Sequence, residues 1–374
     1  MKWEKKKLGD LIDLYDNIRV PLSGIEREKR QGEYPYYGAQ SIIDYVNEYL
    51  FDGNYILIAE DGENLRTRNQ PIAFAVSGQF WVNNHAHIVK GKSNIADDLF
   101  IKYFLNNIDI NPYVTGAAQP KLSQRNLKEI AIIVPPLSTQ RKIASILSAY
   151  DDLIENNLKR IKLLEEKAFV TYKGIVSSEK LEEFTIDEVC ETSGGGTPST
   201  TNSQFWDEGE ILWFSPTDLT RHHSIVLLDS DKKITELGLQ KSSAKLVPPK
   251  TILMTSRASI GYFGLINKPA STNQGFINII PFNKNHSAYM LFDLKNRKEE
   301  IIGNANGSTF LEISKGKFRQ MKIKLPKFEG VLIEFEKEFE TLFNLIENLL
   351  KQNTRLREAR DILLPRLMNG QIEV

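Results

Sequence analysis

The stretch Ser138–Ala168 (STQRKIASILSAYDDLIENNLKRIKLLEEKA) contains neither glycine nor proline. Apolar or core-type residues recur along it at alternating steps of four and three: Ile143, Leu147, Tyr150, Ile154, Asn157, Ile161, Leu164 and Ala168. This spacing is typical of a coiled-coil seam and is narrower than the apolar stripe of an ordinary surface helix. The stretch therefore predicts a long helix that pairs with a second helix.

A second helix of the same kind is predicted further along the chain. Its seam residues follow the same steps: Phe335, Phe339, Leu342, Ile346, Leu349, Asn353 and Leu356. Gly116 and Gly307, Ser123 and Ser314, and Pro135 and Pro326 are each separated by about 191 positions, and both helices contain Leu-Ile-Glu-Asn. A constant separation of this kind indicates a tandem repeat. The chain is thus expected to be a globular region and a long helix, followed by the same again.

The two helices are expected to pair antiparallel, with Asn157 opposite Asn353 and Ile161 opposite Leu349. Ile154 then lies opposite Leu356. A buried Asn pair specifies register, because a slip leaves its amide groups without partners. The outer face, including Arg141, Asp151, Asp152, Asn156 and Lys159, would stay free for another subunit. The alternatives are that each helix packs on its own globular region, or that both Asn residues face solvent at a helix bend.

The two globular regions, 1–137 and 180–328, both read as strands with one short helix. Strands are expected in the first at 55–59, 72–76, 87–89 and 130–134, and in the second at 210–214, 251–254 and 276–280. Short helices are expected at 97–107 and 288–296. Pro135-Pro136 ends the last strand of the first region, and Ser138 is predicted to cap the helix that follows.

Composition narrows the class of protein. Of the 374 residues, 41% are hydrophobic and 26% are charged, as in ordinary soluble globular proteins. A single cysteine, Cys190, excludes an intramolecular disulfide and a cysteine-based zinc site and favours the cytosol. The first residues lack the apolar core of a signal peptide, and no apolar run approaches membrane-spanning length.

The net charge argues against a chain that grips DNA alone. Lys+Arg and Asp+Glu both number 48, whereas a protein that holds DNA by phosphate contacts is usually basic. Either nucleic acid is not the partner, or another subunit supplies much of the phosphate contact.

No catalytic or metal-binding set emerges from the sequence. His85 and His87 would share one face of a strand, but a metal needs further ligands at suitable spacing. Ser193–Pro198 is glycine-rich without a phosphate-loop pattern and reads as a flexible surface loop. Glu165 and Glu166 read as part of a solvated helix face.

The loops do offer side chains of the types that read base edges in the major groove. In the first region the candidates are Arg66, Arg68, Asn69, Asn84, His85, Gln119, Lys121, Gln124 and Arg125. In the second they are Thr197, Ser199, Arg221, His222, His223, Arg257, Asn273, Gln274, Ser308 and Thr309. Trp81, Trp213 and Phe214 lie nearby in sequence and would be able to pack on sugars or bases. For any single residue, a plain solvated loop position is the alternative.

Several segments together resemble the specificity subunits of Type I restriction–modification systems. They are Thr115–Ser123 (TGAAQPKLS), Leu127–Ile130 (LKEI), Val134–Ala144 (VPPLSTQRKIA), Ser193–Ser199 (SGGGTPS) and Leu363–Ile372 (LLPRLMNGQI). The resemblance implies an α+β chain with two α/β target-recognition domains in tandem repeat, separated by two long antiparallel helices that form an intramolecular coiled coil. The domains would be 1–137 and 180–328, and the helices 138–179 and 329–374.

The resemblance also implies a function without catalysis on this chain. Each domain would read half of a bipartite DNA site, and the helices would space the halves and dock two methyltransferase subunits. Those subunits would carry S-adenosylmethionine, restriction subunits would join them, and no membrane would be involved. Glu312 stands where Lys121 stands in the first region, which suits two domains that read different sequences. The alternatives are a coiled-coil scaffold that binds proteins, and a lone hydrolase using His85 or His222.

Overall fold

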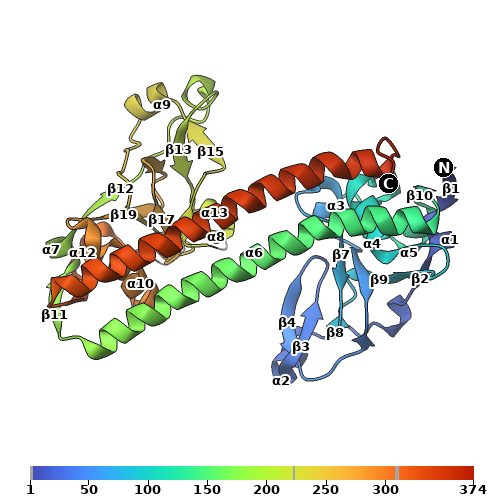
Figure 1. Cartoon of the computed structure of the whole chain (residues 1–374), viewed down its shortest axis with the longest axis horizontal. Helices are drawn as coiled ribbons and strands as arrows, with labels where there is room; N and C mark the ends of the chain where they lie inside the picture. The colour runs from blue at the N-terminus through green and yellow to red at the C-terminus, as the bar shows by residue number, and fades with distance from the viewer. Residues whose placement is uncertain (1–2, 222–223, 308–310) are drawn as a thin grey trace. The chain divides into compact units, whose positions relative to one another are not determined.

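The computed structural model describes residues 3–221, 224–307 and 311–374. The chain forms two compact units (Figure 1). Unit 1 consists of residues up to 154 together with 355–374, and unit 2 consists of residues 155–354. Helices α6 (Leu137–Ser178) and α13 (Glu329–Met368) each contribute one part to either unit.

Unit 1 contains two four-stranded sheets, ordered β2-β9-β6-β7 and β4-β3-β8-β5, and the separate pair β1-β10. Its strands are β1 (Glu4–Lys7), β2 (Ile12–Leu14), β3 (Gln31–Tyr37), β4 (Ile42–Val46), β5 (Phe51–Asp52), β6 (Tyr55–Ala59), β7 (Ala73–Val76), β8 (Gln79–Val82), β9 (Ala86–Gly91) and β10 (Ala131–Val134). Its shorter helices are α1 (Leu8–Leu11), η1 (Asp16–Ile18), α2 (Gly24–Lys29), α3 (Asn64–Thr67), α4 (Asp98–Asn107), η2 (Asn111–Tyr113) and α5 (Gln124–Glu129).

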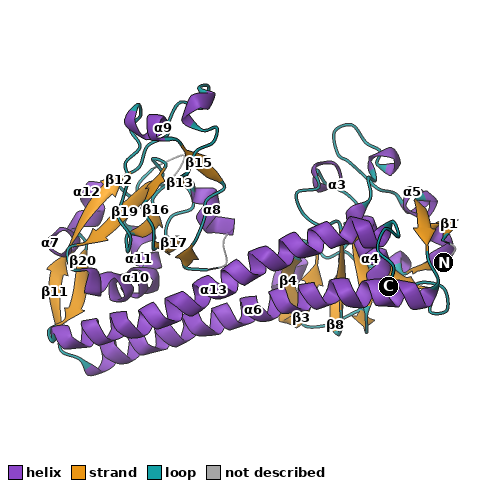
Figure 2. Ribbon diagram, turned by 45° about the horizontal axis from the view of Figure 1, so that its top comes forward, coloured by secondary structure: helices purple, strands orange, loops and turns teal. Residues whose placement is uncertain are grey.

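Unit 2 is built in the same way, with a five-stranded sheet β12-β19-β16-β17-β14, a three-stranded sheet β15-β13-β18 and the pair β11-β20 (Figure 2). Its strands are β11 (Leu181–Thr185), β12 (Cys190–Gly194), β13 (Ile211–Phe214), β14 (Val226–Leu227), β15 (Lys232–Ile234), β16 (Ile252–Thr255), β17 (Phe263–Ile266), β18 (Ala270–Thr272), β19 (Phe276–Pro281) and β20 (Lys322–Pro326). Its shorter helices are α7 (Ile186–Val189), η3 (Ser203–Phe205), α8 (Pro216–Arg221), α9 (Glu236–Gln240), η4 (Lys284–His286), α10 (Ser287–Asn296), α11 (Lys298–Gly303) and α12 (Lys315–Gln320).

The predicted repeat is confirmed by strand pairing. The order β2-β9-β6-β7 in unit 1 matches β12-β19-β16-β17 in unit 2, and the parallel pair β3-β8 matches β13-β18. The loop pairing of Thr115 with Lys121 recurs between Asn306 and Glu312. Both halves of the chain therefore build one scaffold, because the same pattern of apolar strand segments recurs in each.

The long helices lie antiparallel within each unit. In unit 2 the amide of Asn157 donates to Asn353 Oδ1 at 2.9 Å, and in unit 1 Arg360 forms an ion pair with Asp151 at 2.7 Å. Asn157 and Asn353 are buried, so they do not face solvent at a bend. Of the other seam residues, those that are buried are Ile143, Leu147, Ile154, Ile161, Ala168, Phe335, Phe339, Leu342, Ile346 and Leu349, and those that are partly buried are Tyr150, Leu164 and Leu356.

Each core joins a sheet to the long helices. In unit 1 Phe100 and Ile101 of α4 lie in one cluster with Ile143 and Leu147 of α6 and Leu367 of α13. In unit 2 α10 contributes a fully buried run to a cluster that includes Tyr172, Phe335 and Phe339. Each unit therefore uses both long helices as part of its core.

Several local expectations are wrong. Ser138 does not cap α6, because the helix begins at Leu137 and the Pro136 carbonyl accepts from the amides of Thr139 and Gln140. Asp151 is not free on an outer face, since Lys102, Tyr103 and Arg360 all contact its carboxylate. Long helices have more than one neighbour, and heptad spacing alone does not show which polar residues meet the globular part.

Two more segments are less exposed than expected. Glu165 is not part of a solvated face, because it accepts hydrogen bonds from Ser224 Oγ at 2.7 Å and from the Ile225 amide at 2.9 Å. Ser193 and Gly194 belong to β12, and Gly195 lies so close to the Thr272 carbonyl that a Cβ would clash. Gly195 and Gly196 permit close approach of neighbouring backbone rather than flexibility. Within the described residues no helix is both long and apolar enough to cross a bilayer.

Candidate nucleic-acid interface

In unit 1, loops that are distant in sequence meet at one edge of the β2-β9-β6-β7 sheet. This loop edge of unit 1 comprises residues 16–19, 60–68, 83–85 and 115–125. The Glu60 amide donates to the His85 carbonyl at 2.9 Å, and the Leu122 amide donates to the Glu60 carbonyl at 2.8 Å. Backbone hydrogen bonds therefore join the segment after β6, the segment before β9 and the 115–125 loop.

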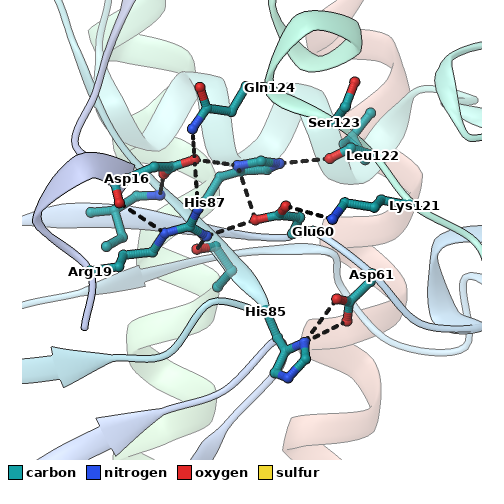
Figure 3. A network of polar contacts seen from close by, with 12 residues as sticks. Asp16, Arg19, Glu60, Asp61, His85, His87, Lys121, Leu122, Ser123 and Gln124 are labelled. Atoms are coloured by element: carbon teal, nitrogen blue, oxygen red, sulfur yellow. Dashed lines mark hydrogen bonds and ion pairs between the residues drawn. The ribbon is translucent and has the colours of Figure 1, made fainter. Parts of the chain in front are cut away.

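A buried polar network lies beneath this edge (Figure 3). Asp16 faces His87 Nδ1 at 2.6 Å and accepts from the Ile88 amide and from Gln124 Nε2. Arg19 donates to Glu60 at 2.7 Å, and Lys121 reaches the other oxygen of Glu60 at 3.2 Å. The network links segments 16–19, 60–68 and 115–125 to one another and to His87 of β9.

The network keeps its carboxyl groups ionised. Burial alone would raise the pKa of Asp16, but the hydrogen bond and charge of His87 outweigh it, so the pKa is lowered. Burial likewise opposes ionisation of Glu60, yet Arg19 and His87 bring the pKa of Glu60 below its ordinary value. Paired charges of opposite sign compensate each other for the loss of water.

His85 and His87 do not share a surface. His87 is fully buried, while His85 lies before β9, is exposed and faces Asp61 at 2.8 Å. No further ligands were expected near His87, but Asp16, Glu60 and His87 place ligand atoms within 4.8 Å of one another. Arg19 pairs with both carboxylates and Lys121 pairs with Glu60, so this donor set does not fit a cation.

The candidate base readers of unit 1 fall into groups. Within the described residues, Asn69, Asn84, Gln119 and Arg125 are exposed and have no side-chain hydrogen bond. Arg66, His85, Lys121 and Gln124 are exposed but partnered, by the Gly116 and Ala117 carbonyls, Asp61, Glu60 and Asp16 respectively. Arg68 points inward, since it donates to the Leu105 and Asn106 carbonyls and burial lowers its pKa.

Unit 2 repeats the same backbone frame at its loop edge, which comprises residues 194–199, 256–257, 273–275, 306–307 and 311–312. The Ser256 amide donates to the Gly275 carbonyl at 2.8 Å, and the Ile313 amide donates to the Ser256 carbonyl at 3.0 Å. Asn273 Oδ1 accepts from the Gly275 amide at 2.8 Å, as Asn83 Oδ1 accepts from His85. Glu60, His85 and Lys121 thus correspond to Ser256, Gly275 and Glu312.

The side chains on this frame differ from those of unit 1. Arg257 forms an ion pair with Glu312 at 2.8 Å, and Thr197 donates to Gln274 at 2.6 Å. Ser199 contacts Thr201, and Arg221 is exposed at the end of α8. His222, His223, Ser308 and Thr309 lie outside the described residues.

The expectation that aromatic residues pack on bases is wrong for the three residues named. Phe214 is fully buried, and Trp81 and Trp213 are nearly so. Trp81 donates to the Val20 carbonyl, and Trp213 donates to the Gly196 carbonyl. Their polar sequence neighbours reflect the ends of strands β8 and β13 rather than exposure of the rings.

Asp16, Arg19 and Glu60 were not among the candidates. One sequence signal for their role is His87 inside the apolar strand β9, because a buried histidine needs polar partners. Another is the recurrence of Asn83-Asn-His85 as Asn273-Gln-Gly275, which marks equivalent loops in the two units.

Comparisons with known proteins agree with this architecture. A family model described as the Type I restriction modification DNA specificity domain matches residues 1–166 and again 178–357. A putative type I restriction enzyme specificity subunit of Haemophilus influenzae is 40% identical over 146 residues, which are 39% of this chain and 37% of the relative. The MjaIX specificity subunit of Methanocaldococcus jannaschii is 36% identical over 46% of this chain and 40% of the relative.

The matches with these two relatives thus span less than half of their length. A third relative, the MjaVIII specificity subunit of Methanocaldococcus jannaschii, is 24% identical over 100% of this chain and 93% of its own. The crystal structure of a Type-I restriction-modification system S subunit from M. genitalium aligns with a TM-score of 0.61 at 17% identity, covering 98% of this chain and 96% of that one. Since the family model matches nearly the whole chain, as two successive copies, the chain belongs to the family of Type I restriction–modification DNA specificity proteins.

Proposed function

We propose that this chain is a non-catalytic subunit that reads a bipartite DNA target, one half with unit 1 and the other with unit 2. The observation that carries the proposal is the pair of loop edges. One backbone frame recurs in both units, yet equivalent positions hold Lys121 and Glu312. Two readers of different half-sites need this combination, because base contacts depend on side chains while docking depends on the scaffold.

The chain would act with partners in the cytoplasm. Two methyltransferase subunits would carry S-adenosylmethionine and dock on the helices, and restriction subunits would complete the complex. The formal net charge of +0 supports shared DNA contact, since phosphate binding needs cationic groups that other subunits would then supply. The paired helices would set the spacer between the half-sites, whose centres favour a separation of about 34 Å on one face of B-DNA.

The decisive experiment is methylome sequencing of a host that expresses this chain with its cognate methyltransferase. The expected result is one bipartite methylated motif that disappears when the chain is omitted. Methylation without a motif, or no DNA footprint from the assembled complex, would favour the alternative of a protein-binding scaffold.

One variant in each unit assigns the halves. Gln119→Ala in unit 1 is expected to relax one half of the motif, and Gln274→Ala in unit 2 the other, each by about tenfold in discrimination at one position. If both variants relaxed the same half, the assignment of one half-site to each unit would be wrong.

The role of the long helices in setting the spacer between the half-sites can be tested separately. Removing seven residues from the middle of each helix keeps the seam in phase and is expected to change the tolerated spacer while the half-sites stay the same. An unchanged spacer would contradict the role of the helices as a ruler.

A further inference from the structure

The most exposed part of the loop edge of unit 1 is the tip Gly116–Pro120, which carries Gln119. All of its residues except Pro120 are exposed. At its base the amide and carbonyl groups of Thr115 and Lys121 exchange hydrogen bonds of 2.8 and 2.7 Å. The Gly62 amide donates to the Pro120 carbonyl at 3.1 Å. These bonds hold the tip at its base, and Arg66 also donates directly to the Gly116 and Ala117 carbonyls.

The buried network holds that base from below. The Leu122 carbonyl accepts from His87 Nε2 at 2.7 Å, while the Leu122 amide is bound to the Glu60 carbonyl. Two residues further along, Gln124 donates to Asp16, which also faces His87. Leu122 and Gln124 are thus attached to one buried pair, Asp16 and His87 (Figure 3).

His87 contacts the network through both nitrogens of its ring. Both ring nitrogens face acceptors, a carboxylate on one side and a carbonyl on the other. The ring is therefore anchored at both of its nitrogens. Asp16, Glu60, Arg19 and Lys121 are the charged groups around the ring, and they leave it little freedom to turn.

Unit 2 has no such pair at the equivalent positions. The strand pairing of β12 with β19 sets Gly194 opposite Ile277, where unit 1 has Asp16 and His87. The base of its 306–312 loop is held by the backbone and by the exposed ion pair of Arg257 and Glu312. Disturbing the buried pair should therefore affect one unit alone.

We propose that Asp16 and His87 are positioning residues that hold the Gly116–Pro120 tip and thereby determine how strictly unit 1 discriminates bases. This inference rests on the proposed function and adds specificity determinants that do not themselves contact DNA. It concerns only the half-site read by unit 1.

The test compares variants of the full chain, each expressed with the cognate methyltransferase and examined by methylome sequencing. The double variant Asp16→Gly/His87→Ile installs the residues that unit 2 has at the equivalent positions. It removes both members of the buried pair, so that neither is left buried without the other. Its expected effect is about tenfold weaker discrimination at one or more positions of the first half-site, with the second half-site unchanged. The control Ile277→Val, at the position equivalent to His87, is expected to change neither half.

Two conservative variants separate positioning from stability. Asp16→Asn keeps the shape of the side chain, and His87→Gln keeps one amide donor, so both are expected to relax the same positions less than the double variant does. Thermal melting of each purified complex measures its stability. Variants that lose methylation equally at all sites, or do not accumulate as folded chains even with the conservative changes, would assign the pair a purely structural role and overturn the inference.

Unchanged discrimination in the double variant would also overturn it. Failure of the proposed function looks different, because the unaltered chain would then yield no bipartite motif at all.

Discussion

The loop edges of units 1 and 2 share a backbone and differ in chemistry. In both, the segment after one central strand (β6 or β16) forms backbone hydrogen bonds with the segment before the adjacent strand (β9 or β19). It also forms one with a loop further along the chain. Unit 1 fills this frame with the buried charges of Asp16, Arg19, Glu60 and His87, whereas unit 2 has Gly194, Ser256 and Ile277 at equivalent places. Since main-chain hydrogen bonds carry the geometry, the side chains are free to diverge without loss of the fold.

The junctions with the long helices differ in the same manner. In unit 1, Asp151 of α6 binds Lys102, Tyr103 and Arg360. In unit 2, α10 meets α13 through aromatic rings, and Phe339 contacts Phe292 edge to face with ring centroids 5.5 Å apart. The contacts described for the two junctions are thus of different kinds, which predicts unequal responses to mutation.

The largest effect is expected from Phe339→Ala in unit 2. Truncating this buried ring should cost about 3–5 kcal/mol of unfolding free energy, because a cavity remains among its aromatic neighbours. Hydrogen exchange followed by mass spectrometry would locate the loss in unit 2. Leu345→Ala on the same helix is the control, since Leu345 is 46% exposed, and equal losses for the two variants would contradict the packing described.

A smaller effect is expected at the Asn pair of unit 2. Asn157→Leu removes the donor of the buried hydrogen bond to Asn353 Oδ1 and should destabilise the unit by about 1–3 kcal/mol. Asn157→Leu/Asn353→Leu should recover most of that loss while permitting other helix registers. Denaturant unfolding measures the energies, and exposed Asn156→Leu is the control. A single variant as stable as the unaltered chain would exclude a role of this pair in register.

Low pH is expected to change the stability of the two units differently. The lowered pKa values of Asp16, Glu60 and Asp151 stabilise unit 1 above the unfolded carboxyl pKa of about 4, and this stability is lost as pH falls through the folded values. In unit 2, burial raises the pKa of Glu165 and Asp293, so their contribution is greatest at low pH and is lost as pH rises.

Hydrogen exchange compared between pH 7 and a pH below the unfolded carboxyl pKa of about 4 should therefore show unit 1 losing more protection than unit 2. Asp98 acts against this trend, since burial raises its pKa in unit 1. Asp293→Asn should flatten the pH response of unit 2. Greater acid sensitivity of unit 2 would contradict the assignment.

The smallest stability effect is expected from exchanging the exposed pair of unit 2 for the residues of unit 1. Arg257→Asp/Glu312→Lys should change stability by less than about 1 kcal/mol, because half-exposed ion pairs contribute little. Under the proposed function it should still alter the second half-site in the methylome. A change in the first half-site instead would contradict the equivalence of the two loops.

Regular patterns were predictable from sequence, and contacts among distant loops were not. The heptad steps predicted the antiparallel helices and the opposition of Asn157 to Asn353, because every turn of a helix repeats the same constraint. The network of Asp16, Glu60 and His87 joins loops that no periodicity links. Trp81 was misassigned because polar neighbours at a strand end do not report which way the ring points.

Arg68 illustrates a further limit. Its backbone is left-handed, with φ of 53°, and this turns the guanidinium toward carbonyl groups at the end of α4. A loop arginine looks like a DNA contact in sequence, and only the local backbone shows that it stabilises a helix terminus instead.

The discontinuity of unit 1 has a consequence for how the protein is made. Leu367 and Met368 belong to its core, and Gly370 lies against Trp3, so unit 1 lacks part of its interior until the last helix has been synthesised. Unit 2 is one continuous segment and has all its residues earlier. Domains generally fold as units during synthesis, so unit 1 should be completed only after α13 has been made, and a truncation within α13 should damage the fold of unit 1 although most of that unit is translated first.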